Sequence, residues 1–145
     1  MTEKQGDSGN IIPLFGDQLL RQQRETSAYY AYGLETSGAE HGQEEWIYFC
    51  HGPQAPSDMI RYANIQRIFS PDLNLVTLIL ENEAFYIHGR LVERILLPIQ
   101  MRRLRSLYVF DPARHTESPG NETKITRIDR YTREDFERGL KPPGL

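Results

Sequence analysis

The side chains best suited to covalent or acid–base chemistry in this sequence are one cysteine and four histidines. Cys50 and His51 are neighbours in the segment Glu45–His51, whose aromatic content predicts a strand. Successive side chains of a strand point to opposite faces, so this pair is not placed to act as nucleophile and base. We therefore expect Cys50 to be a small core residue. No G-x-S-x-G motif indicates a serine nucleophile.

The histidines show none of the spacings that hold a metal ion. His41, His51, His88 and His115 form no H-x-H, H-x-x-x-H or H-E-x-x-H motif, so we expect no metal site. The phosphate-binding motifs GxxxxGK[ST] and GxGxxG are also absent, and we expect no cofactor. His51 and His88 both end predicted strands and could approach each other. A small enzyme with a His51/His88 site is therefore one alternative, although the sequence favours a protein that is not an enzyme.

A basic and apolar segment, Arg90–Arg105, is the best candidate for a helix. On an unbroken helix four of its arginines would share an arc of about 120°, while Arg103 would lie elsewhere. Arginines on such a face could contact phosphates. A nucleic-acid-binding protein is therefore a second alternative, although a net charge of −3 indicates no strongly basic domain. The nucleic-acid-binding residues in this alternative are Arg90, Arg94, Arg102, Arg103 and Arg105.

The same segment has two apolar faces. One face would carry Val92, Ile95, Leu96 and Ile99, and the opposite face would carry Leu97, Met101 and Leu104. Pro98 lies between the two patterns, and proline disfavours helical geometry at the preceding residue, so we expect a kink or break near Leu97–Pro98. One face can pack on a core, but the ridge of Leu97, Met101 and Leu104 then needs something else to cover it.

Surplus apolar surface leads to the main functional hypothesis. The ridge, the N-terminal patch that ends at Phe15 and the cluster Tyr29, Tyr30 and Tyr32 exceed what one sheet and one helix obviously bury. Aromatic residues, methionine and arginine are enriched in interface cores, and homodimers commonly cover such surface. We therefore predict a non-enzymatic interaction module that self-associates or binds a protein partner. Its predicted partner-binding residues are Leu97, Met101, Leu104 and Phe15. The alternative that all this surface is monomer core stays open.

The elements that must position these residues are mostly strands. Alternating or apolar runs predict strands over Ser27–Leu34, Glu45–His51, Leu73–Leu80, Ala84–His88, Leu107–Phe110 and Ile125–Tyr131, and one or two short strands within Met59–Phe69. We expect the first two to form a hairpin, as well as Leu73–Leu80 with Ala84–His88, and we expect a turn at Ser70–Asp72. Thr132 and Asp135 resemble a capping box that opens a short helix over Arg133–Leu140.

These elements predict an α+β fold. It would have a mainly antiparallel sheet of about five to seven strands, packed by the principal helix at 90–105, with a small C-terminal helix. The order of several strands followed by one helix resembles pleckstrin-homology-like barrels and other small β-barrel binding modules. That resemblance rests on the order of the elements alone, and no motif carries it.

Length and composition suit one folded domain. The chain has 145 residues, of which 39% are hydrophobic and 26% charged. We expect a flexible tail at 1–10, a single α+β domain at 11–140 and a short tail at 141–145. A lone cysteine cannot form an internal disulfide, the first ten residues are polar, and no apolar run is long enough to span a membrane. These features predict a cytoplasmic protein.

Overall fold

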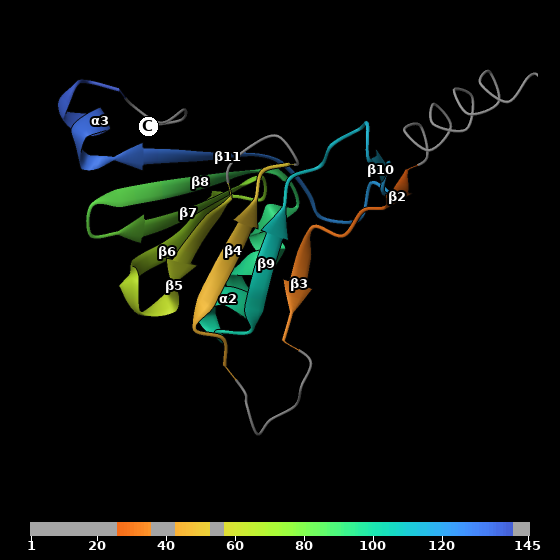
Figure 1. Ribbon diagram of the computed structural model, residues 1–145, viewed down its shortest axis with the longest axis horizontal. Helices are drawn as coiled ribbons and strands as arrows, with labels where there is room; N and C mark the ends of the chain where they lie inside the picture. Colours follow the sequence, from red (N-terminus) through yellow and green to blue (C-terminus); the bar gives the residue numbers. More distant parts are fainter. Residues whose placement is uncertain (1–25, 36–42, 53–56, 141–145) are drawn as a thin grey trace, which may run out of the picture. The chain divides into compact units, whose positions relative to one another are not determined.

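The computed structural model describes residues 26–35, 43–52 and 57–140 of the chain (Figure 1). They belong to two units, one that contains residues 26–29 and 111–117 and another that contains 30–35, 43–52, 57–110 and 118–140. The fold is mainly β, with several small sheets, one helix of nine residues and a short C-terminal helix. The predicted mixture of strands and few helices is therefore confirmed in this coarse form.

The smaller unit contains one short parallel pair. Strand β2 (Ser27–Ala28) lies beside β10 (His115–Thr116). The ring centroids of Tyr29 and His115 are 5.1 Å apart, so these two side chains contact each other within the smaller unit. The predicted strand Ser27–Leu34 is thus two separate strands, because only its second half joins a sheet of the larger unit.

A four-stranded antiparallel sheet, which we call the first sheet, forms one side of the larger unit. Its order is β11 (Lys124–Thr132), β8 (Glu83–Arg90), β7 (Leu75–Leu80) and β6 (Ile65–Asp72). The predicted hairpin of β7 and β8 is confirmed, with Ile79 opposite Ala84. Gly89 is needed for close approach to β11, because a Cβ there would lie 2.0 Å from the Lys124 carbonyl oxygen.

The turn predicted at Ser70–Asp72 is found at the next two residues, 73 and 74. Strand β6 continues through Pro71 to Asp72, with an irregular register after Phe69. The chain reverses at the next two residues, where the Asp72 carboxylate accepts the N–H of Asn74 at 2.7 Å. Proline is tolerated here because β6 is an edge strand, where a missing ladder donor costs little.

The second sheet has the order β3 (Tyr32–Leu34), β9 (Leu104–Tyr108), β4 (Trp46–Cys50) and β5 (Asp58–Arg61). The predicted hairpin between the first two strands of the sequence is wrong, because β9 lies between β3 and β4. Strand β9 runs antiparallel to β3 and parallel to β4. A 3₁₀ turn, η1 (Tyr62–Asn64), leads from β5 into β6, so Met59–Phe69 does contain parts of two strands.

The two four-stranded sheets share a core. Ile47 and Phe49 of β4 are fully buried, and the Phe49 ring meets the ring of Phe85 of β8 edge to face at 5.0 Å. A bridge between Val109 and Ile125 adds a backbone connection between the two sheets. The single sheet of about five to seven strands is therefore corrected to two sheets. The described strands form open sheets and no closed barrel, so the expected resemblance to pleckstrin-homology-like and other small β-barrels is corrected as well.

The principal helix is shorter than predicted. It consists of a 3₁₀ turn, η2 (Val92–Ile95), and α2 (Leu96–Gln100), and it leads into β9 rather than continuing to Arg105. Pro98 lies inside α2 instead of breaking it. It is close to the start of α2, where a missing N–H removes no intrahelical bond. The change in geometry falls between the 3₁₀ turn and Leu96.

A C-terminal capping motif ends this helix. Arg102 adopts a left-handed backbone with φ of 56°. Its N–H donates to the Ile99 carbonyl at 2.9 Å, and the N–H of Arg103 donates to the Pro98 carbonyl at 2.8 Å. These are the two hydrogen bonds of a Schellman motif. Sequence reasoning missed it because glycine or asparagine, not arginine, usually takes the left-handed position.

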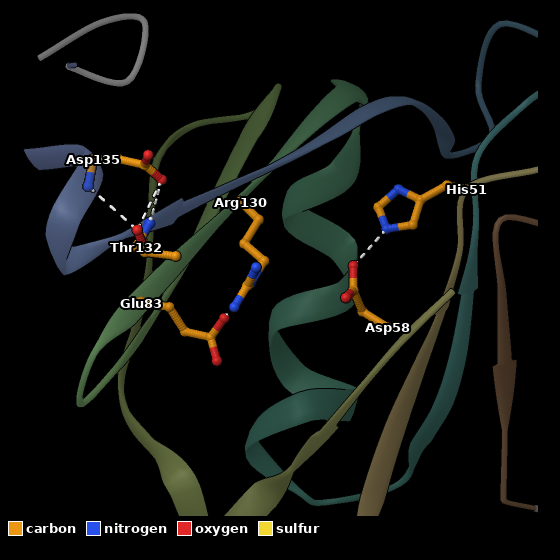
Figure 2. A network of polar contacts seen from close by, with 6 residues as sticks. All are labelled: His51, Asp58, Glu83, Arg130, Thr132 and Asp135. Atoms are coloured by element: carbon orange, nitrogen blue, oxygen red, sulfur yellow. Dashed lines mark hydrogen bonds and ion pairs between the residues drawn. The ribbon is translucent and has the colours of Figure 1, made fainter. Parts of the chain in front are cut away.

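The C-terminal helix α3 (Arg133–Glu137) confirms the predicted capping box (Figure 2). The Thr132 hydroxyl accepts the N–H of Asp135 at 3.2 Å, and the Asp135 carboxylate accepts the N–H of Thr132 at 2.8 Å. The helix ends earlier than the predicted Leu140, at Glu137, and Gly139 follows with φ of 86°.

Candidate functional site

The second sheet exposes large apolar side chains on the face that points away from the core. Trp46 and Tyr48 of β4 are 42% and 40% exposed, and Met59 of β5 is 56% exposed. Met59 lies directly opposite Tyr48 in the ladder. We call these residues, together with Arg61 and Tyr108, the outer sheet face. Its apolar groups are adjacent, which distinguishes them from isolated exposed residues.

The alternation of strand β4 explains why both faces of this sheet are apolar. Ile47 and Phe49 point inward and are fully buried, while Trp46 and Tyr48 alternate with them and point outward. Antiparallel sheets that face water on one side normally carry polar residues there. Strand β4 departs from that pattern, so its outer side chains need another explanation.

A cation and a third aromatic ring extend this face. Arg61 lies opposite Trp46 in the ladder, and its guanidinium carbon is 5.4 Å from the centroid of the Trp46 ring. Tyr108 of β9 lies opposite Cys50 at the other end of β4 and is 37% exposed. Cys50, which we expected in the core, is only partly buried. Aromatic rings, methionine and arginine thus lie together on this sheet.

The predicted helix ridge does not form as one surface. Leu97 and Met101 are exposed around α2, but Leu104 is fully buried in β9. Because the helix ends at Gln100, the spacing that would place Leu104 above Met101 no longer applies. Phe15, the fourth predicted partner-binding residue, lies outside the described residues. Leu97 and Met101 therefore stay candidates, and Leu104 belongs to the core.

Two of the predicted nucleic-acid-binding arginines hold a loop of their own chain. Arg90 donates through Nη2 to the Pro119 carbonyl at 2.8 Å and to the Ser118 hydroxyl at 2.9 Å. Arg94 donates through Nη1 to the Asn121 carbonyl at 2.7 Å. These contacts brace the segment that leads into β11. They also use donors that a phosphate would need.

The other three arginines lie beyond the helix and have different surroundings. The guanidinium carbon of Arg102 is 5.4 Å from the ring centroid of Tyr62. Arg103 donates to the Glu35 backbone carbonyl at 3.2 Å, and Arg105 forms ion pairs with carboxylates. Since the helix stops at Gln100, the five arginines do not form the stripe that a helix over 90–105 would have produced.

Arg105 belongs to a cluster with two carboxylates. Its Nη2 lies 3.0 Å from a carboxylate oxygen of Glu35, which is buried, and 3.5 Å from one of Glu44. A hydrogen bond with Glu35 is the main reason that the pKa of Glu44 is raised, burial adds to the rise, and Arg105 opposes it. Nearby, burial raises the pKa of Tyr62, whose hydroxyl donates to the Leu104 carbonyl at 2.6 Å. The cluster connects β3, β4 and β9.

The two histidines of the enzyme alternative belong to different parts of the fold and have different partners. His51 follows β4 and lies 2.9 Å from the Asp58 carboxylate (Figure 2). His88 is in β8 and lies 3.1 Å from the Asp129 carboxylate of β11. Each imidazole is thus paired with its own aspartate. Within the described ranges, no group of three or more His, Cys, Asp and Glu residues is placed to hold a metal ion.

Two pockets lie on either side of the turn between β7 and β8. The first has a volume of about 360 Å³ and opens between this turn and α3. The second, of about 290 Å³, lies between the same turn and the start of β6. The first is mainly apolar, with Leu80, Ala84 and Phe136 among its lining residues. The size of each is close to the lower end of small-molecule sites.

The comparisons with known proteins name no relative. No protein-family model, curated protein or solved structure matches this chain. In the part of the chain that the structure describes, no helix is long and apolar enough to cross a membrane.

Sequence reasoning missed the outer sheet face and the first pocket. A signal for the face was present: Trp46–Cys50 is apolar at every position, so both faces of the strand are apolar and only one can meet the core. That pattern is also typical of a strand buried on both sides, and the sequence alone does not separate the two cases. No comparable signal marks the pocket, which depends on how α3 lies beside the β7–β8 turn.

Proposed function

We propose that this protein is a non-enzymatic interaction module that self-associates or binds a protein partner through the outer sheet face. The observation that carries the proposal is the adjacency of Trp46, Tyr48 and Met59 on the exposed side of the second sheet. Burying large aromatic and methionine side chains supplies much of the free energy of protein association. Arg61, whose guanidinium carbon lies 5.4 Å from the centroid of the Trp46 ring, adds another residue type that is enriched at interfaces.

The alternation of side chains along β4 supports the same proposal. Ile47 and Phe49 are buried in the core, while Trp46 and Tyr48 point outward. We infer that one face of the second sheet packs on the core and the other binds protein. Leu97 and Met101 of the helix region offer a second, smaller apolar area for the same partner or another.

The test measures the molar mass of the protein by light scattering over a range of concentrations. We expect a mass above the 16.9 kDa of one chain, rising with concentration. The double variant Tyr48→Ser/Met59→Ser should raise the dissociation constant at least about tenfold, as expected when central interface side chains are lost. The control is Leu73→Ser, because Leu73 is about as exposed as Met59 but lies in the β6–β7 turn.

A heterologous partner gives a different result in the same experiment. The wild-type chain would then be monomeric, and a captured protein should be lost with Tyr48→Ser/Met59→Ser but retained with Leu73→Ser. Thermal unfolding of each variant verifies that the fold is intact. A strict monomer that captures nothing through this face would rule the proposal out.

A further inference from the structure

The pocket between the β7–β8 turn and α3 is a candidate ligand site that lies apart from the outer sheet face. Its interior is formed by Ile79, Leu80 and Ala84 of the hairpin and by Phe136 of α3. Leu80 and Ala84 are buried, whereas Phe136 is 40% exposed and forms an accessible wall. A volume of about 360 Å³ suits a small organic molecule rather than a single ion or water.

The walls of this pocket are held together by hydrogen bonds. The N–H of Arg133, the first residue of α3, donates to the Asn82 carbonyl at 2.8 Å. The Arg133 guanidinium donates to the Glu81 carbonyl at 3.3 Å. The capping box at Thr132 fixes the start of the helix, and Thr132 itself pairs with Glu83 in the β8–β11 ladder (Figure 2). The pocket is thus preformed, which lowers the entropic cost of binding.

The polar rim is predominantly acidic. Three carboxylates line the pocket, those of Glu81, Glu83 and Glu137, against one guanidinium, that of Arg133. Arg130 pairs with Glu83 (Figure 2), but neither Glu81 nor Glu137 forms an ion pair with any of the described residues. With Arg130 and Arg133 set against the three carboxylates, the rim keeps one excess negative charge. That charge beside an apolar interior favours a ligand with a positive charge at one end of a hydrocarbon body.

We propose that this pocket binds small amphiphilic cations, in which a short hydrocarbon chain carries one primary ammonium group. The chain occupies the apolar interior between Ala84 and Phe136. The ammonium group lies at the rim, within the field of Glu81 and Glu137. The Arg133 guanidinium is held against the turn, and it occupies one side of the rim.

The test compares three probes with the same hydrocarbon chain: n-hexylammonium, n-hexanol and n-hexanoate. Binding is followed by amide chemical shifts in a titration of the full-length protein. We expect the largest shifts at residues 79–84 and 133–137. We expect n-hexylammonium to bind about two- to fivefold more tightly than n-hexanol, the range typical of a partly exposed charge pair, and n-hexanoate to bind most weakly.

Variants separate the charged contact from the apolar one. Glu137→Gln should remove most of the preference for n-hexylammonium and leave n-hexanol unchanged. Glu134→Gln is the matched control, because it makes the same change on the same helix at a residue that does not line the pocket. Phe136→Ala should weaken n-hexylammonium and n-hexanol by a similar factor, since it removes an apolar wall that both contact.

Three results would overturn the proposal. One is binding of n-hexanoate as tight as that of n-hexylammonium. Another is an equal effect of Glu134→Gln and Glu137→Gln, and a third is the absence of shifts at the pocket residues. The amide spectrum of each variant verifies its fold. Because this pocket and the outer sheet face use different residues, either proposal can fail without the other.

Discussion

Arg105 lies between two carboxylates, and this arrangement has a consequence for stability. The Glu35 and Glu44 carboxylates both approach its Nη2, at 3.0 and 3.5 Å. One guanidinium does not fully offset two negative charges in a partly buried site. The pKa of Glu44 is therefore raised, chiefly by its hydrogen bond with Glu35. The folded protein therefore binds a proton at Glu44 more tightly than the unfolded chain does.

The residue-scale prediction concerns Glu44→Gln. A raised pKa in the folded state means that the contribution of Glu44 is fully present below the ordinary pKa of the carboxyl group and is lost as the pH rises through the folded value. Glutamine stays uncharged and can still donate to Glu35. The variant should therefore gain stability relative to the wild type as the pH approaches neutrality, by about 0.5 kcal/mol.

Urea unfolding at a series of pH values measures this difference. The control is Glu45→Gln, because Glu45 is the next residue, is exposed and undergoes the same change of charge. If the two variants follow the same curve, the hydrogen bond between Glu35 and Glu44 does not determine the titration of Glu44.

At the scale of elements, the stability of the short helix α3 depends on the interactions at its start and along its side. Helix α3 has five residues, too few to be stable by intrinsic helix propensity. It is held by the Thr132–Asp135 capping box and by contact of the Phe136 ring with Tyr131, at 6.0 Å between centroids. The hydrogen bonds from Thr132 also lower the pKa of Asp135. The cap is therefore strongest above the ordinary titration range of aspartate and weakens as the pH falls through the lowered pKa.

The element-scale prediction is that Thr132→Ala reduces the free energy of opening α3 by about 1 kcal/mol, because one N-terminal N–H loses its acceptor. Amide hydrogen exchange over Asp135–Arg138 measures the effect locally. Thr132→Ser keeps a hydroxyl at the cap and should leave exchange near the wild-type rate. Equal exchange in all three proteins would show that the cap does not limit opening of the helix.

At the scale of the whole larger unit, the two sheets depend on a shared core. Phe49 and Phe85 come from different sheets and meet edge to face, and Ile47, Leu78 and Ile87 are fully buried around the same interior. Edge-to-face aromatic pairs add about 0.5–1.5 kcal/mol beyond the free energy of burial. Loss of one ring should thus weaken both sheets together.

The prediction at this scale is that Phe85→Ala lowers the free energy of unfolding by about 3–5 kcal/mol, the range for a large cavity in a packed core. Phe136→Ala is the matched control, because the same side chain is removed from a half-exposed position. It should cost about 1 kcal/mol or less. Denaturant unfolding measures both. A small loss for Phe85→Ala would mean that the two sheets are stabilised independently.

Local features of this protein were accessible from sequence. The β7–β8 hairpin, strand β11 and the capping box of α3 were predicted at nearly their observed positions. Each depends on residues close together in the chain: an apolar run that reverses over a short loop, or a hydroxyl three residues from a carboxylate. The coarse class, mainly strands with few helices, follows from the same local patterns.

Local sequence patterns did not predict where the principal helix ends or in which order the strands pair. An arginine at a left-handed position ends α2, although its side chain gives no such signal. The parallel pairing of β4 with β9 joins segments about 60 residues apart and displaces the expected hairpin. This pairing made Leu104 a core residue and separated the five arginines.

For the two candidate sites as well, some features follow from the sequence and others only from the tertiary structure. The sequence alone determined that β4 is apolar on both faces and that the C-terminal helix begins at a capped threonine. Only the tertiary structure decided that Ile47 and Phe49 meet Phe85 while Trp46 and Tyr48 stay exposed. It also decided that α3 and the β7–β8 turn enclose a pocket. The reason is physical: periodicity determines which side chains share a face, but long-range pairing determines which face is covered.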